Sequence, residues 1–445
     1  MDQKSLFLHT SPTRLFFKAA LPGSIGMLAS SLYQLLDGVF VGQLLGGEAF
    51  AAINLAMPLV IINFAISDLI GVGSAVPISV RLGEKRPEEA NNIFTCACLM
   101  VVAQGIVVGA FLYLASPMLL RWMGAEGALL EMATQYIRVY AITSPVTGML
   151  YAVDNYLRIC GRIKGSMMLN VAMSVLCALG EFIMLAVLRV GVWGAALGTS
   201  VGMMICVVVA MWPFFCGSLT LKFRRPHFTW PIIRQIVTCG TPTFLNNIAG
   251  RVTSILMNMV LLRVGGAAAV SVYGILMYAD GIVMQFMYGM CDSLQPAVGY
   301  NWGAGRRDRV LAIEKRCFLA AGSISVLAAA VIFAFPGQIT TLFMADSEPT
   351  VYAMAVPALR LFCLTYLTRW FSFATQSFMS AVEKPVLASL LSISTALLFP
   401  VLLIAALWPL GLNGLWFNMS GTALLAAVVA VLVLLYFRRR YWKNA

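Results

Sequence analysis

Histidine and charged residues are scarce in this sequence, and several functional classes can be excluded on that basis. Charged residues make up 11% of the chain, and both histidines, His9 and His227, lie outside its apolar stretches. This argues against a histidine-based metal site or a Ser–His–Asp triad. The cysteines lack metal-binding spacing, since only one residue separates Cys96 from Cys98. The chain also has no phosphate-binding GxxxxGK[ST] loop, so we expect no ATP drive, no resident cofactor and no enzyme activity.

Apolar residues dominate the chain. They make up 60% of its 445 residues, and the mean hydropathy is +0.88. Apolar stretches long enough to cross a bilayer as helices recur from end to end, and the alternating pattern of a membrane β-barrel is absent. We therefore predict an all-α polytopic membrane protein with twelve transmembrane helices, at 15–44, 50–79, 91–116, 132–157, 165–188, 192–216, 232–263, 268–299, 311–335, 351–380, 386–408 and 412–437.

Basic residues are distributed unevenly along the chain. The formal net charge is +12, but most Lys and Arg residues fall in the N-terminal tail, in the loops after spans 2, 4, 6 and 8, and at the C-terminus, from Lys4 to Lys443. This is the positive-inside pattern, and it places both termini in the cytoplasm. We expect these residues to orient the chain and contact anionic lipid, not nucleic acid.

The two halves of the sequence resemble each other. Leu21-Pro22 recurs as Thr241-Pro242, and the glycine pair at 46–47 recurs at 265–266. The offset stays near 220 residues (Pro22 to Pro242) through six spans, which predicts two pseudo-symmetric six-helix bundles. We assign residues 1–216 to an N-terminal lobe, 217–234 to a cytoplasmic linker, and 235–445 to a C-terminal lobe with a basic tail. Parallel repeats of this kind are typical of transporters.

Six acidic residues lie in or near the apolar spans: Asp37, Asp68, Asp154, Glu181, Asp280 and Asp292. An acid at the bilayer centre costs about 2.5–3.5 kcal/mol, so it needs a partner, water or a proton. Asp37 and Glu181 are our candidates for proton coupling; the alternative is a permanently neutral acid that joins two helices. For Asp68, Asp280 and Asp292 both readings stay open. Asp154 is expected to pair with Arg158 or Arg162.

Other residues are candidates for motion or substrate contact. Pro22 weakens a helix by removing a backbone hydrogen bond and is a candidate hinge, unless it simply opens the helix. Gly38 and Gly42 beside Asp37 predict a close helix approach. The candidate substrate contacts are Gln34, Asp68, Asp292 and a methionine stripe of Met284, Met287 and Met290, although such a stripe is also typical of plain packing.

Several motifs in both halves resemble the multidrug and toxic compound extrusion (MATE) family, in its bacterial DinF-like and MepA-like branch. They are LPGSIGMLASSLYQLLDGVFVG (21–42), ISVRLGEKR (78–86), DNYLRICGR (154–162), GVWGAALGTSVG (191–202) and LQPAVGYNWGAGRR (294–307). The resemblance implies the MATE fold and export of organic, often cationic, compounds against inward H⁺ or Na⁺ flow.

The resemblance also implies roles for single residues. Asp37 matches the family's cation-coupling acid, and Pro22 matches its bending proline. The family's Asn and Asp on span 5 fall at Cys177 and Glu181, and its threonine on span 6 falls at Thr199. A thiol replaces the amide here, and a neutral thiol is a poor sodium ligand, so we expect H⁺ coupling, with Na⁺ the alternative.

We therefore expect a cation-coupled multidrug exporter in the bacterial inner membrane, functional as a monomer, whose partners are small organic substrates and membrane lipid. A lipid-linked or glycan flippase is an alternative, disfavoured because intramembrane basic residues are few: Arg138, Arg251, Arg360 and Arg369. A structural or receptor-like membrane subunit is a further alternative, against which the duplication and the buried acids argue.

Overall fold

The computed structural model describes residues 5–343 and 349–442, so Lys4 and Lys443 lie outside the described residues. Within these ranges the fold is helical and contains no strand. The first half contains a short π-helix, η1 (Ser5–His9), and then α1 (Pro12–Leu44), α2 (Gly47–Gly83), α3 (Pro87–Trp122), α4 (Gly127–Thr147), α5 (Met149–Ile159), α6 (Ile163–Phe182), η2 (Ile183–Val187) and α7 (Val192–Phe215).

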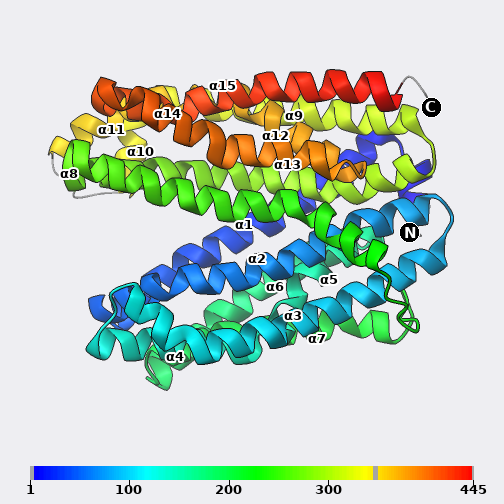
Figure 1. Ribbon diagram of the computed structural model, residues 1–445, viewed down its shortest axis with the longest axis horizontal. Coiled ribbons are helices and arrows are strands. Elements are labelled where there is room, and N and C mark those ends of the chain that lie inside the picture. The colour runs from blue at the N-terminus through cyan, green and yellow to red at the C-terminus, as the bar shows by residue number, and fades with distance from the viewer. Residues whose placement is uncertain (1–4, 344–348, 443–445) are drawn as a thin grey trace. The chain divides into compact units, whose positions relative to one another are not determined.

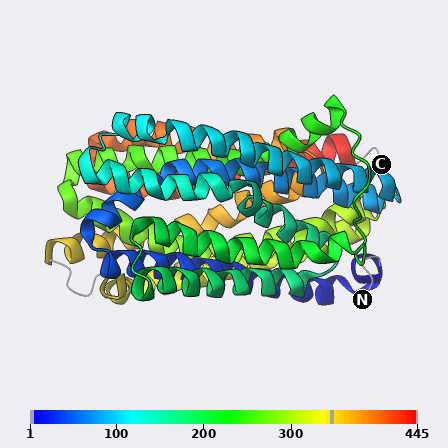
Figure 2. The same ribbon diagram turned by 90° about the horizontal axis from the view of Figure 1, so that it is seen from below.

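The second half opens with one long helical stretch, α8 (Trp230–Gly303), which is broken at Gly266, where φ is 67°. It continues with α9 (Arg307–Ala334), α10 (Pro336–Phe343), α11 (Pro349–Phe362), α12 (Thr365–Ala381), α13 (Pro385–Ile393), η3 (Ser394–Leu398), α14 (Phe399–Leu407), η4 (Trp408–Leu410), α15 (Gly411–Phe437) and η5 (Arg438–Trp442). Within each half the long helices run side by side with one another (Figures 1 and 2).

Each of the twelve predicted spans lies on helix in the structure. Two predicted spans share α8, and the span predicted at 351–380 is the pair α11 and α12, bent by 49°. The span predicted at 132–157 is also a pair, α4 and α5, which meet at Gly148. By length and apolar composition alone, the described residues contain 8 membrane-crossing helices, or up to 9 with the bent pair. Two of those stretches are long enough to carry two spans each.

The chain folds into two compact units. The first comprises the chain up to Gly240 together with Gly299–Arg307, and the second comprises Thr241–Val298 together with the chain from Asp308. Close backbone packing explains why both ends of α8 belong to the first unit. A Cβ added to Gly73 of α2 would clash with the Ile236 carbonyl, and one added to Gly303 would clash with the Val80 carbonyl. Only glycine permits such contact between helix backbones.

The linker is fastened to α3 by side chains near the start of that helix. The backbone N–H groups of Lys222 and His227 donate to the Asn91 and Asn92 side-chain oxygens at 2.9 and 2.8 Å. The Arg224 N–H donates to Thr95 Oγ1 at 3.1 Å. These bonds satisfy backbone donors that an irregular segment would otherwise leave to water.

Candidate functional site

Three helices of the first unit bring the predicted coupling residues together. Asp37 lies on α1, Cys177 and Glu181 lie on α6, and Thr199 lies on α7. The sequence favours this arrangement because glycines recur every fourth residue on α7. A Cβ added to Gly198 would come within 2.5 Å of the Glu181 backbone nitrogen, and one added to Gly202 within 2.8 Å of the Cys177 nitrogen. The two helix backbones therefore approach closely and place Glu181 beside Thr199.

The carboxyl groups of Asp37 and Glu181 are neighbours, close enough for their charges to influence each other. The Glu181 side chain is fully buried, and that of Asp37 is half-buried. Among the described residues neither carboxyl forms an ion pair with a basic side chain, and Glu181 Oε1 has no hydrogen-bond partner. Two carboxylates cannot both stay ionised in such surroundings without a compensating cation, so the chemistry of the pair suits the binding of a proton or a small cation.

A hydroxyl relay connects Glu181 to the backbone of α7. The Tyr33 hydroxyl lies 2.7 Å from Thr199 Oγ1 and 3.5 Å from Glu181 Oε2. Thr199 Oγ1 in turn donates to the Ala195 carbonyl at 3.1 Å. Each hydroxyl has one proton to donate, so the relay can run in one direction only at any time. Its direction depends on whether Glu181 holds a proton.

The Cys177 side chain contacts the main chain of Thr199. Its thiol donates to the Thr199 carbonyl oxygen at 3.4 Å, and the side chain is buried. The Cys177 sulfur therefore links α6 to α7 beside the carboxyl pair, and it provides no oxygen ligand for a metal cation. No cluster of three or more His, Cys, Asp or Glu residues suited to a metal ion occurs in the part of the chain that the structure describes.

Pro22 lies within α1 and not at its start, because the helix begins at Pro12. The interpretation that Pro22 simply opens the helix is therefore wrong. One turn further on, a Cβ added to Gly26 would come within 3.3 Å of the Asn170 side chain, which marks tight α1–α6 packing. The predicted close approach at Gly38 and Gly42 is also wrong: nothing in the described chain lies within 4 Å of a Cβ added at either position.

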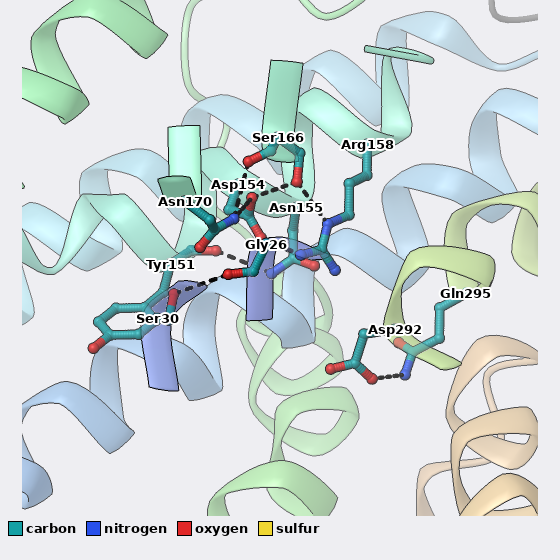
Figure 3. Close-up of polar contacts among 10 residues, drawn as sticks. All are labelled: Gly26, Ser30, Tyr151, Asp154, Asn155, Arg158, Ser166, Asn170, Asp292 and Gln295. Carbon is teal, nitrogen blue, oxygen red and sulfur yellow. Dashed lines mark hydrogen bonds and ion pairs between the residues drawn. The ribbon is translucent and has the colours of Figure 1, made fainter. Parts of the chain in front are cut away.

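Asp154 and Arg158 form a buried network at the end of α5, as the sequence predicted (Figure 3). Arg158 donates to Asp154 Oδ2 at 2.6 Å. Ser166 and Asn170 of α6 donate to Asp154 Oδ1 at 2.5 and 2.8 Å. Asn170 also packs against Gly26 of α1, one helical turn after Pro22. The network therefore fixes the part of α6 that lies against α1 near Pro22.

The other candidate residues of the first unit lie apart from this set. Gln34 is exposed on α1, and Asp68 is half-buried on α2. The neighbour of Gln34 in the sequence, Tyr33, is the residue of α1 that contacts Glu181 and Thr199. Tyr33 precedes Asp37 by about one helical turn, so the sequence places both on the same side of α1. To choose Tyr33 as a site residue, however, one must know which face of α1 packs on α6.

The second unit contains the remaining candidates. Asp280 is buried and accepts hydrogen bonds from Arg369 at 2.7 Å and from Tyr366 at 3.0 Å. Asp292 accepts a hydrogen bond from the Gln295 side chain at 3.0 Å (Figure 3). The Gln295 side chain also donates to Ser377. Of the methionine stripe, Met284 lines a cavity, whereas Met287 and Met290 are buried in packing.

The MatE family model matches residues 22–183 and 242–404, one stretch in each half of the chain. This chain belongs to the MatE family. Its membership confirms the predicted resemblance and the all-α fold of twelve transmembrane helices in two six-helix bundles. The chain is a multi-pass membrane transporter.

Curated relatives and solved structures agree with the MatE assignment. The chain is 25% identical over 449 residues to multidrug export protein MepA of Staphylococcus aureus (strain NCTC 8325 / PS 47), covering 99% of this chain and 97% of that protein. It is 24% identical over 443 residues to MepA of Staphylococcus saprophyticus, with the same coverage. A crystal structure of MATE in complex with MaL6 matches with a TM-score of 0.91 at 23% identity, covering 99% and 98% of the two chains. MATE in the bent conformation matches with a TM-score of 0.90 at 23% identity, covering 99% and 97%.

Proposed function

We propose that this chain is a secondary active multidrug exporter that expels organic, often cationic, compounds in exchange for inward H⁺. The family assignment and the relatives named multidrug export proteins support the transport class. The distribution of basic residues supports a bacterial inner-membrane protein with both termini in the cytoplasm. Each chain carries both bundles, which supports function as a monomer.

The observation that carries the coupling proposal is the proximity of Asp37 and Glu181 in a largely buried setting without a basic partner among the described residues. Desolvation and mutual repulsion both favour loading this pair with one positive charge. The half-buried Asp37 is the member of the pair that water reaches, so a proton arrives there and is shared with Glu181. Cys177 in place of an oxygen ligand favours H⁺ over Na⁺ at this position.

The hydroxyl relay converts this charge change into a rearrangement. With a proton on Glu181, donation runs from Glu181 to Tyr33, then to Thr199 and on to the Ala195 carbonyl. An ionised Glu181 instead requires the Tyr33 proton, and Thr199 must then turn its own proton away from Ala195 toward Tyr33. The contact between α1 and α7 therefore has two hydrogen-bond states, and Pro22 is the point at which α1 can bend in response.

Drug and proton must antagonise each other in this scheme. If protonation lowers drug affinity by some factor, bound drug lowers proton affinity by the same factor. The test is Asp37→Asn in inside-out vesicles with an imposed pH gradient, followed by uptake of a fluorescent cationic dye. We expect loss of gradient-driven transport with dye binding retained. The matched control is Glu48→Gln, an exposed acid in the first turn of α2, which should transport normally. Full transport by Asp37→Asn would refute the assignment.

The coupling ion needs a second measurement. Purified protein in weakly buffered solution should release protons when drug is added, to the same extent with and without sodium. Proton release that disappears in Asp37→Asn supports H⁺ coupling at this pair. Drug-dependent transport that requires sodium and releases no protons would assign the site to Na⁺.

A flippase for lipid-linked or glycan substrates is the less favoured function. Such a protein needs unpaired basic charge in its interior, whereas Arg369 is paired with Asp280 and Arg138 lies over the Tyr113 ring at 4.9 Å.

A further inference from the structure

The second unit contains a cavity of about 210 Å³ that the transport scheme above does not use. It lies among α8, α12, η3, α14 and α15, and all of its lining residues belong to the second unit. The lining combines hydroxyl and amide groups with methionine and aromatic side chains. Concave sites with a few convergent polar groups in an apolar wall are the usual form of small-molecule sites.

The internal repeat relates this cavity to the carboxyl site of the first unit. With the offset from Pro22 to Pro242, Tyr33 corresponds to Thr253, Asp37 to Met257 and Thr199 to Met419. All three counterparts line the cavity. The cavity therefore overlaps the place equivalent to the carboxyl site, but the counterparts of Glu181 and Cys177, which are Val401 and Leu397, do not line it. The counterpart of Asp37 is a methionine, which has no carboxyl group to hold a proton.

A different charged pair, Asp280 and Arg369, provides the polarity of the second cavity. Both line its wall, and Arg369 Nη1 donates to Asp280 Oδ1 at 2.7 Å. Tyr366 donates to the same oxygen. Among the described residues, Asp280 Oδ2 accepts no hydrogen bond, and the Nε and Nη2 groups of Arg369 donate none. A guanidinium carries five N–H donors in a fork that matches a carboxylate.

The charge balance of this cavity selects the kind of ligand. One acid and one base compensate each other, so a ligand with a single net charge would leave an uncompensated charge in a cavity whose wall is largely apolar. A zwitterion adds no net charge and offers a carboxylate to Arg369 and an ammonium group to Asp280. The edge-to-face pair of Tyr288 and Phe373, with ring centroids 4.7 Å apart, and Met284 offer an apolar wall for its body.

We propose that this cavity is a second ligand site, specific for small organic zwitterions of about the size of an aromatic amino acid. Arg369 binds the carboxylate, Asp280 binds the ammonium group, and the aromatic and methionine wall holds the apolar part. The site is separate from the Asp37–Glu181 pair and gives the transporter a second substrate class beside organic cations.

Three indole compounds test this proposal by equilibrium calorimetry on the full chain in lipid nanodiscs, without any gradient. Tryptophan is a zwitterion at pH 7, tryptamine lacks its carboxylate, and indole-3-propionate lacks its amine. We expect tryptophan to bind at least about tenfold tighter than either analogue, the change that one hydrogen bond to a charged group supports.

The double variant Asp280→Asn with Arg369→Gln removes both charges and leaves no unpaired ion, so it is expected to fold. We expect it to bind the three compounds with similar affinity. Arg369→Lys keeps the charge but loses the planar fork, and it should weaken tryptophan binding while the protein stays folded.

The Asp37→Asn variant distinguishes a failure of this proposal from a failure of the proposed coupling function. It should retain the preference for tryptophan whether or not transport is proton-coupled. The proposal is overturned if tryptophan shows no saturable binding, if it binds no tighter than both analogues, or if its preference survives in the double variant.

Discussion

The Tyr33 hydroxyl lies 2.7 Å from Thr199 Oγ1, across the contact between α1 and α7. The same hydroxyl reaches Glu181 Oε2 at 3.5 Å, so one phenol proton has two possible acceptors. This relationship makes Tyr33 the residue through which a charge change on α6 reaches α1.

Tyr33→Phe removes the shared proton and leaves the ring in place. We expect dye efflux driven by a pH gradient to fall by at least about tenfold, with a loss of about 1 kcal/mol in the free energy of unfolding, typical of one hydrogen bond. The control is Tyr113→Phe, since Tyr113 is partly exposed and contacts Arg138 through its ring. Unchanged efflux in Tyr33→Phe would remove the hydroxyl relay from the mechanism.

Pro22→Ala should make α1 stiffer. Proline in a helix interior weakens the helix by about 3 kcal/mol, so alanine restores a backbone hydrogen bond and disfavours bending. We expect slower hydrogen exchange at residues 18–26 and loss of transport, with drug binding retained. Pro12→Ala is the control, because Pro12 is in the first turn, where a missing N–H costs little. Equal transport by the two variants would contradict a hinge at Pro22.

Asp154→Asn should destabilise the first unit. Arg158 is 2% exposed, and the variant leaves its charge buried without a counter-ion, which costs about 3–5 kcal/mol. Thermal unfolding in detergent measures the effect. Glu84→Gln disrupts ion pairs to Arg81 and Arg86 that are partly exposed, and it should cost about 1 kcal/mol or less. A similar melting temperature for the two variants would show that the Asp154 network contributes no special stability.

Gly240→Ala should strain the contact between α2 and α8. Its Cβ would clash with the Leu69 carbonyl, and overpacking of this kind costs about 1–3 kcal/mol. Gly274→Ala in the same helix has open space around its Cβ and should leave stability unchanged or raise it by up to about 1 kcal/mol. Thermal unfolding compares them, and the reverse order of stabilities would refute the packing argument.

The twelve spans and the buried acids were predictable because each leaves a local signal, either a long apolar run or a charge inside one. The pairing of Asp280 with Arg369 was not predictable, since 89 residues separate them and only the fold brings them together. Tyr33 was missed for a narrower reason. Tyr33 and Gln34 both lie about one turn before Asp37, but adjacent residues point about 100° apart on a helix, and the apolar pattern of α1 is too uniform to show which face packs.

The predicted close approach at Gly38 and Gly42 failed for a related reason. A glycine marks a possible contact, but whether a neighbouring helix lies there depends on the fold. Gly198 and Gly202 on α7, by contrast, do face the backbone of α6.

The attachment of residues 222–227 to α3 has a practical consequence for splitting the gene. Dividing the chain before Lys222 would leave the first half without the linker segment that Asn91, Asn92 and Thr95 hold, and without the glycine contact at Gly240. A break after Gly240 would keep both with the first polypeptide but would interrupt α8. Two co-expressed fragments should therefore reassemble best when the first extends beyond the linker and the second repeats residues 217–240, so that each contains every contact its own helices require.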